Sequence, residues 1–168
     1  GLPSGRVLIA GGLDLDADHP YDGKPIPTAE IYDPTTDAFT EISAAAPIPG
    51  DARAVVLPSG DVLIVGDKIA YRFDEAANEL SVVGSAPEHS FGAAVLPGGR
   101  LLACGLDRCD TGTEAGIATD PVLDGAQSKG HSLTALANGE LFALGMTPFF
   151  ARHTFSFRGF SPGVVRPV

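Results

Sequence analysis

The sequence of 168 residues contains no tryptophan, one methionine and two cysteines, and aromatic residues make up only 7% of it. Charged residues account for 19%, which is below the usual quarter. No apolar run approaches the roughly 18 residues that a membrane-spanning helix needs, so we expect no membrane span. Helical periodicity is also absent along the chain, which argues against a helical fold.

The two cysteines, Cys104 and Cys109, lie in the segment CGLDRC. A disulfide between them would close a small loop and stabilise the protein modestly. Two thiols alone do not make a closed metal site. The sequence leaves a disulfide and free thiols both open. It also leaves the cellular location open, with an extracellular or cell-envelope location favoured.

Apolar residues make up 44% of the chain, which excludes a disordered protein. The 21 glycines and 14 prolines together supply 35 of the 168 residues, so we expect many short elements joined by tight turns. The formal net charge of −10 repels phosphate backbones and argues against nucleic-acid binding. The chain opens at GLPSG without an initiator methionine, which suggests a trimmed or processed product or a fragment.

A segment of eleven residues recurs four times, and each copy predicts a tight turn between two apolar strands. The turns place Gly after Ser, Gly or Asn, which supplies the positive φ of two-residue hairpin turns. The apolar run after each turn is typical of a strand buried on both faces. The copies are 2–12 (LPSGRVLIAGG), 57–67 (LPSGDVLIVGD), 96–106 (LPGGRLLACGL) and 136–146 (LANGELFALGM), with starts 55, 39 and 40 residues apart.

A second repeated unit follows the first. Residues 28–43 align with residues 70–84, which makes Asp33 equivalent to Asp74 and Phe39 to Leu80. Asp120-Pro121 is interpreted as a weaker third copy of the Asp-Pro turn, and 147–168 as a degenerate fourth unit. Each unit then holds about four short strands in about 40 residues, which is the spacing of a propeller blade.

The first copy resembles the Kelch repeat, in the bacterial form related to propellers of the galactose-oxidase type. The marks of the family are Gly11-Gly12, then Tyr32-Asp33-Pro34, then Phe39. The later copies lose the second Gly, and the chain has no Trp for the last strand. The resemblance implies an all-β fold of four-stranded antiparallel blades in one domain. The expected blades are about 1–48, 49–87, 88–128 and 129–168.

Four blades are fewer than the six or seven of the family's ring. The chain is therefore expected to form a four-bladed ring, half of a ring shared by two chains, or part of a longer propeller. The first copy starts at a turn and lacks its innermost strand. Residues 163–168 (GVVRPV) resemble the segment before the second turn, so we predict that they supply this strand and close the ring.

No catalytic constellation is recognisable. The relatives of the galactose-oxidase type are copper enzymes that need two Tyr, two His and a Tyr–Cys crosslink, but Tyr32 belongs to the repeat itself. His89 and His131 occupy different repeat positions and are interpreted as strand-end residues that bond a neighbouring blade. Ser90 and Ser132 each directly follow a His, and neighbours on a strand point to opposite faces. We therefore expect no catalytic residue.

Residues 13–27 are an insertion that only the first copy has, and we predict a loop projecting from one face of the propeller. Its D-x-D-x-D start is typical of calcium loops, although His19 and Pro25 stand where an EF-hand has Gly and Glu. A looser calcium site, a transition-metal site including His19, and a solvated or partner-binding acidic loop stay open. The predicted calcium ligands are Asp14, Asp16, Asp18 and Asp22, and the partner-binding residues add His19 and Tyr21 to these.

These patterns predict a non-catalytic binding or scaffold module that presents loops on a rigid propeller. The expected partner is a protein or a glycan, or a second copy that completes the propeller. Calcium is the one cofactor that the sequence suggests. One alternative is a calcium-dependent glycan-binding module. The other is part of a galactose-oxidase-like enzyme whose active site lies on blades absent from this chain.

Overall fold

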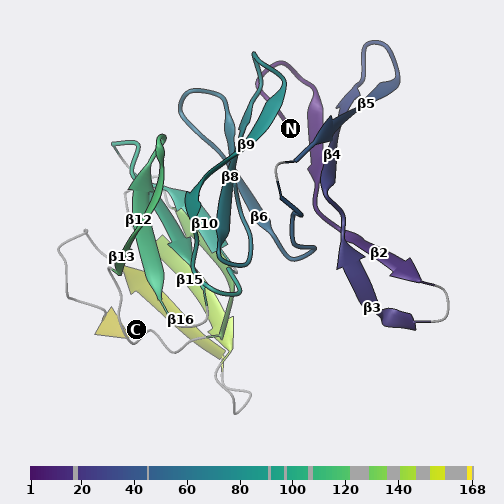
Figure 1. Ribbon diagram of the computed structural model, residues 1–168. Helices are drawn as coiled ribbons and strands as arrows, with labels where there is room; N and C mark the ends of the chain where they lie inside the picture. Colours follow the sequence, from purple (N-terminus) through teal and green to yellow (C-terminus); the bar gives the residue numbers. More distant parts are fainter. Residues whose placement is uncertain are drawn as a thin grey trace.

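The structure is a computed structural model, and all regular elements that it describes are β-strands, so the predicted all-β class is confirmed. The strands form several small antiparallel sheets (Figure 1). No helix long and apolar enough to cross a membrane is found in the described part. The described residues are 1–16, 19–44, 46–90, 92–96, 98–105, 108–121, 129–135, 141–146, 152–157 and 166–167.

Each sheet of three or four strands is built from strands in their order along the chain, and the two-stranded hairpin β2–β3 is inserted within the first of them. The first sheet has three strands, β1 (Val7–Ala10), β4 (Thr28–Asp33) and β5 (Ala38–Ser43). The second has β6 (Arg53–Val56), β7 (Val62–Val65), β8 (Ile69–Asp74) and β9 (Glu79–Ser85). The third has β10 (Gly92–Val95), β11 (Leu101–Cys104), β12 (Cys109–Thr113) and β13 (Gly116–Pro121). The fourth has β14 (Lys129–Ala135), β15 (Leu141–Met146), β16 (Arg152–Phe157) and β17 (Arg166–Pro167).

The central strand β7 is apolar at every position because the hydrophobic core extends over both of its faces. All four of its residues are buried, and its alternating residues belong to different clusters. Ile64 lies in one cluster with Phe73 and with Ile31 of the first sheet. Leu63 lies in another with Leu101 of the third sheet. The repeat has a continuous apolar run because this strand packs against the neighbouring sheet on each of its faces.

Equivalent strands of successive sheets lie next to one another. The first strands β6, β10 and β14 are in contact, and so are the last strands β5, β9 and β13. A polar contact also recurs between sheets. The Ser4 hydroxyl donates to the Glu75 carboxylate in the β8–β9 turn, and the Ser59 amide donates to Glu114 Oε1 at 3.0 Å. Equivalent positions of the repeat therefore make the contacts between sheets as well as the pairing within each sheet.

The predicted equivalence of Asp33 and Asp74 is confirmed by their turns. Asp33 Oδ1 accepts the Thr35 amide hydrogen at 2.8 Å, and Asp74 Oδ1 accepts the Ala77 amide hydrogen at 2.9 Å. Each carboxylate caps the turn that leads into the last strand of its sheet. The residue before that strand has a left-handed φ in both turns, at Asp37 (52°) and Asn78 (56°).

The interpretation of Asp120-Pro121 as a third Asp-Pro turn is wrong. Both residues lie in β13, where Pro121 is paired with Asp110 of β12. The turn before β13 instead lies between the paired residues Thr113 and Gly116. The two-residue connection Glu114-Ala115, which is followed by Gly116 at φ 141°, needs no Asp-Pro cap, so the signal of the other copies is absent here.

The prediction that the C-terminal residues complete the first sheet is also wrong for the described part of that segment. Arg166 and Pro167 pair with Ser156 and Phe155, so β17 is the outer strand of the fourth sheet. The outer position there is the one that β9 and β13 occupy in their sheets. Among the described residues, β1 is an edge strand of a three-stranded sheet, whereas the equivalent strand β7 has a neighbour on each side.

Cys104 and Cys109 form a disulfide, which decides between the two alternatives that the sequence left open. The two residues are paired opposite each other at the end of β11 and the start of β12. Gly105 donates its amide hydrogen to the Arg108 carbonyl at 2.9 Å within the same hairpin. The disulfide therefore closes a local hairpin.

Candidate functional site

The acidic insertion forms a β-hairpin, β2 (Leu13–Asp16) and β3 (His19–Pro25), where the sequence had suggested an irregular loop. It is inserted between β1 and β4, which pair directly with each other. Its base is held by the Ile26 amide, which donates to the Gly12 carbonyl at 3.1 Å. The hairpin extends away from the sheets (Figure 1), as the repeat spacing predicted for this segment.

Strand β2 alternates leucine with aspartate, and neighbouring residues of a strand point to opposite faces. Leu13 and Leu15 are 47% and 55% exposed, so the apolar face of β2 is largely open to solvent. Asp14 is exposed and lies opposite Lys24 of β3. The hairpin thus presents an apolar face and a charged face on one projecting element.

The structure brings the predicted hairpin residues into one element. Asp14 is an exposed residue of β2, and the backbones of Asp16 and His19 are paired at the end of the hairpin. Tyr21 and Asp22 lie in β3. Asp18 lies outside the described residues, as do the side chains of Asp16, His19, Tyr21 and Asp22. The calcium and partner-binding assignments therefore stay predictions.

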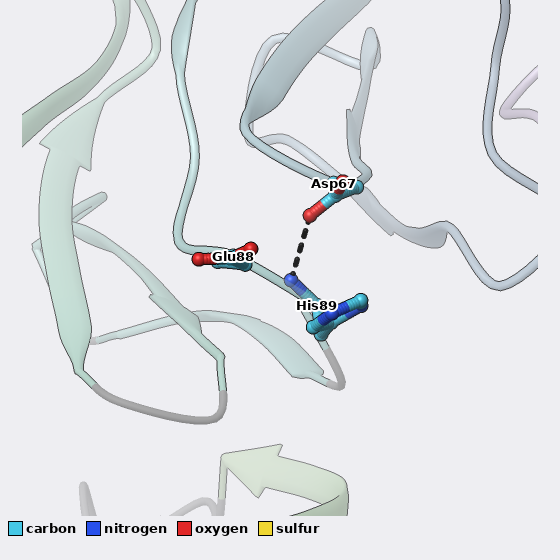
Figure 2. A group of neighbouring side chains, drawn as sticks. All are labelled: Asp67, Glu88 and His89. Atoms are coloured by element: carbon cyan, nitrogen blue, oxygen red, sulfur yellow. Dashed lines mark hydrogen bonds between the residues drawn. The ribbon is translucent and has the colours of Figure 1, made fainter.

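A second group of ligand-type side chains lies elsewhere, and the sequence had not indicated it. Asp67, Glu88 and His89 each offer one ligand atom, and these atoms lie within 4.8 Å of one another. Figure 2 shows the Asp67 carboxylate directed at the segment that contains the other two residues. Asp67 is half-buried, whereas Glu88 and His89 are exposed. In the described part of the chain, this is the group of His, Cys, Asp and Glu side chains that could hold an ion.

Two hydrogen bonds join the two segments of this group. Asp67 and Lys68 lie in the connection between β7 and β8, and Glu88 and His89 lie between β9 and β10. The His89 amide donates to Asp67 Oδ1 at 3.0 Å. The Lys68 carbonyl accepts the Ala86 amide hydrogen at 3.1 Å. The loop of the second sheet is therefore attached to the connection that leads into the third sheet.

The charges of the group are partly balanced by one cation. Lys68 Nζ lies 3.0 Å from Glu88 Oε1, and both side chains are about half exposed or more. This hydrogen bond, with the nearby negative charges of Glu88 and Asp67, raises the pKa of Lys68. The site therefore already attracts a positive charge.

The sequence contained a weak signal for this group. Asp67 stands where the first copy of the repeat has its second glycine, Gly12, so the change introduces a carboxylate at the end of a buried strand. His89 was interpreted as a strand-end residue that bonds a neighbouring blade. It lies between the second and third sheets and bonds Asp67 of the second through its backbone amide. The structure describes only the backbone of His131, in β14.

No protein-family model matches the chain, and no curated protein sequence matches it. Several solved structures resemble the chain, among them two from Bacteroides species. One is a protein of unknown function from Bacteroides caccae, with a TM-score of 0.53 and 14% identity, covering 95% of this chain and 56% of the other. The second is an auxiliary nutrient binding protein from Bacteroides ovatus, with a TM-score of 0.53 and 11% identity, covering 94% of this chain and 51% of the other. The chain thus spans about half the length of each structure, and at this identity the likeness concerns the fold.

Proposed function

We propose that the chain is a non-catalytic binding module built on Kelch-like propeller blades. Support comes from the recurrence of sheets with four consecutive antiparallel strands, and from the contacts between equivalent strands of successive sheets. The glycine and Tyr-Asp-Pro positions of the first copy resemble those of the Kelch repeat. In this proposal the sheets are the blades of a propeller, and the propeller holds the loops between strands in fixed positions.

The single observation that favours binding is the projecting hairpin β2–β3. Only the first copy has this insertion, and β1 and β4 pair without it. It exposes Leu13 and Leu15 on one face, whereas a strand that served only the fold would bury such residues. An exposed apolar strand with flanking carboxylates suits a partner that offers apolar surface and positive charge.

Two classes of ligand fit the proposed binding module. A protein partner suits the exposed leucines of the hairpin. The name of the Bacteroides ovatus structure, an auxiliary nutrient binding protein, favours a small ligand or a glycan instead. A calcium-dependent glycan-binding module is therefore the second candidate, with Asp14 among its predicted ligands.

We also propose that a second copy of this chain completes the propeller by pairing one of its strands with the edge strand β1. This strand has the apolar sequence VLIA, yet Val7 and Ile9 are 37% and 45% exposed. The equivalent strand β7 has its innermost neighbour β6 and is buried throughout. An edge strand with unpaired backbone groups is a template for another strand. Two copies would also reach the length of the two similar structures.

Binding to glycan and peptide arrays tests the proposal. The chain is applied with calcium or with EDTA, beside the double variant Leu13→Ser with Leu15→Ser. The control is Val82→Ser, since Val82 is 45% exposed on β9, outside the hairpin. We expect a ligand that the wild type and the Val82 variant retain and the hairpin variant loses. Retention that needs calcium favours the glycan-binding candidate, and turnover of a retained sugar contradicts a non-catalytic role.

A further inference from the structure

We propose that Asp67, Glu88 and His89 bind a divalent transition-metal ion between the second and third sheets. The inference does not depend on the proposed binding function, because it rests on three side chains outside the hairpin. One ligand atom from each lies within 4.8 Å of the other two. The residues come from two segments far apart in sequence, 67 and 88–89, which the fold places side by side (Figure 2).

The ligand types indicate which ion fits. Calcium and magnesium take oxygen ligands almost alone, whereas an imidazole nitrogen suits zinc, cobalt, nickel and copper. Zinc accepts both carboxylate oxygen and imidazole nitrogen as ligands, and open zinc sites hold the ion with three protein ligands. Such a set leaves a coordination position for water or for an atom of a ligand. The site therefore differs in metal preference from the carboxylate-rich hairpin.

The three ligand atoms need a small adjustment to share an ion. Two ligands of a tetrahedral zinc ion lie roughly 3.3 Å apart, which is closer than the 4.8 Å limit of this group. The Glu88 and His89 side chains leave the backbone on opposite sides (Figure 2). Because both are exposed, they can change rotamer without disturbing the core. Asp67 is half-buried and supplies the fixed point of the site.

Hydrogen bonds hold the two segments together without an ion. The His89 amide donates to the side-chain oxygen Asp67 Oδ1, and the Lys68 carbonyl accepts the Ala86 amide hydrogen. These bonds reduce the ordering that an ion would have to impose. A bound ion would add a link between the second sheet and the connection to the third sheet, and so should raise the unfolding temperature.

Lys68 is the natural competitor of the ion. Its ammonium lies 3.0 Å from Glu88 Oε1, but its side chain is 62% exposed and can turn away. Removal of this ammonium should strengthen metal binding, because Glu88 then has no cation to exchange. The effect provides a second, independent prediction of opposite sign to the loss of a ligand.

Zinc titration by calorimetry, together with thermal unfolding, tests the site on the full chain. His89 has φ 47° and Lys68 has φ 65°, so glycine suits the backbone at both positions and leaves the amide donors in place. The ligand variants are His89→Gly and Asp67→Asn. The matched controls are Lys68→Gly at the same site and Asp14→Asn in the hairpin.

We expect one zinc ion per chain, a zinc-dependent rise in unfolding temperature, and no comparable effect of calcium. Each ligand variant should bind zinc at least about tenfold more weakly. Asp14→Asn should bind as the wild type does, and Lys68→Gly more tightly. Unfolding temperatures in EDTA show whether each variant is folded. Wild-type zinc affinity in either His89→Gly or Asp67→Asn, or no zinc binding by the wild type, overturns the proposal.

Discussion

Tyr71 joins the second sheet to the segment that leads into it. The side chain is fully buried in β8, and its hydroxyl donates to the Pro47 carbonyl at 2.6 Å. Pro47 lies between β5 and β6, so the bond fixes the passage from the first sheet to the second. Burial raises the pKa of Tyr71, which keeps the hydroxyl protonated as a donor.

Tyr71→Phe should therefore lower the free energy of unfolding by about 1–3 kcal/mol, because the Pro47 carbonyl loses its partner. Tyr32→Phe is the matched control, since the Tyr32 hydroxyl donates to Asp37 Oδ1 at 3.0 Å near the surface. That change should stay within about 0.5 kcal/mol. Urea denaturation of both variants measures the difference, and equal losses would contradict the structural role of Tyr71.

Asp33 gives the stability a dependence on acid. Hydrogen bonds from the hydroxyl and the amide of Thr35 lower the pKa of Asp33 below its ordinary value. A carboxyl whose pKa is lower in the folded state stabilises the protein above its unfolded pKa. That stabilisation is lost as the pH falls through the folded value.

Asp33→Asn should therefore be less stable than the wild type at neutral pH. The difference should shrink as the pH falls below roughly 4. Thermal unfolding of both proteins between neutral and acid pH measures it. A difference that does not change with pH would mean that the ionised form of Asp33 has no role in the turn.

At the scale of elements, Gly116 lets the outer strands β9 and β13 approach each other. A Cβ at this glycine would meet the Val83 carbonyl of β9, and φ is 141°. Gly116→Ala should cost about 2–4 kcal/mol, from overpacking and backbone strain together. Gly98→Ala is the control, because Gly98 has φ 85° but open space around its Cα. It should cost about 1–2 kcal/mol by denaturation, and an equal cost at Gly116 would contradict close packing of the sheets.

The hairpin β2–β3 should be dispensable for folding. Joining Gly12 directly to Ile26 removes residues 13–25 and leaves a short connection between β1 and β4, of a length common in β-hairpins. We expect the free energy of unfolding to change by less than about 1 kcal/mol, since Leu13 and Leu15 are largely exposed. Circular dichroism and urea denaturation measure this. If the variant fails to fold, the prediction is wrong and the hairpin is needed for the folding of the sheets.

The repeat arithmetic predicted the existence and order of most elements because each turn dipeptide and apolar run is a local signal. It placed the insertion correctly but missed that it is a hairpin, since the segment 13–27 contains three prolines, which are rare inside strands. Pro20 and Pro25 are nevertheless accommodated in the two-stranded hairpin, where β3 has a single neighbouring strand. Elements whose turns depart from the repeat, such as β12–β13, were the ones predicted wrongly.

The change to Asp67 in the repeat is visible in the sequence, but the approach of Asp67 to Glu88 and His89 could not be predicted, for a different reason. The three residues belong to loops about 20 residues apart in sequence, and their approach depends on how one sheet leads into the next. A repeat alignment shows which residues are equivalent but not which loops meet. The hairpin carboxylates, by contrast, are neighbours in sequence and were visible at once.

For the whole molecule, the edge strand β1 is the place where we propose that a second copy pairs. Ile9→Lys places a charge on this edge, which should prevent a strand of a second copy from pairing there. Phe39→Lys on β5 is the control, because Phe39 is 60% exposed on the opposite edge of the same sheet. Size-exclusion chromatography should show a smaller particle for the β1 variant than for the β5 variant. Equal sizes would exclude β1 as the contact.

Light scattering across a range of concentrations measures the mass of the wild-type chain in solution. This measurement tests most directly the proposal that a second copy pairs with the edge strand β1. Each chain has a mass of 17.2 kDa. We predict a particle of two chains, in which a second copy covers the edge at β1. A single-chain mass at every concentration would contradict this prediction and favour a propeller that is closed by one chain alone.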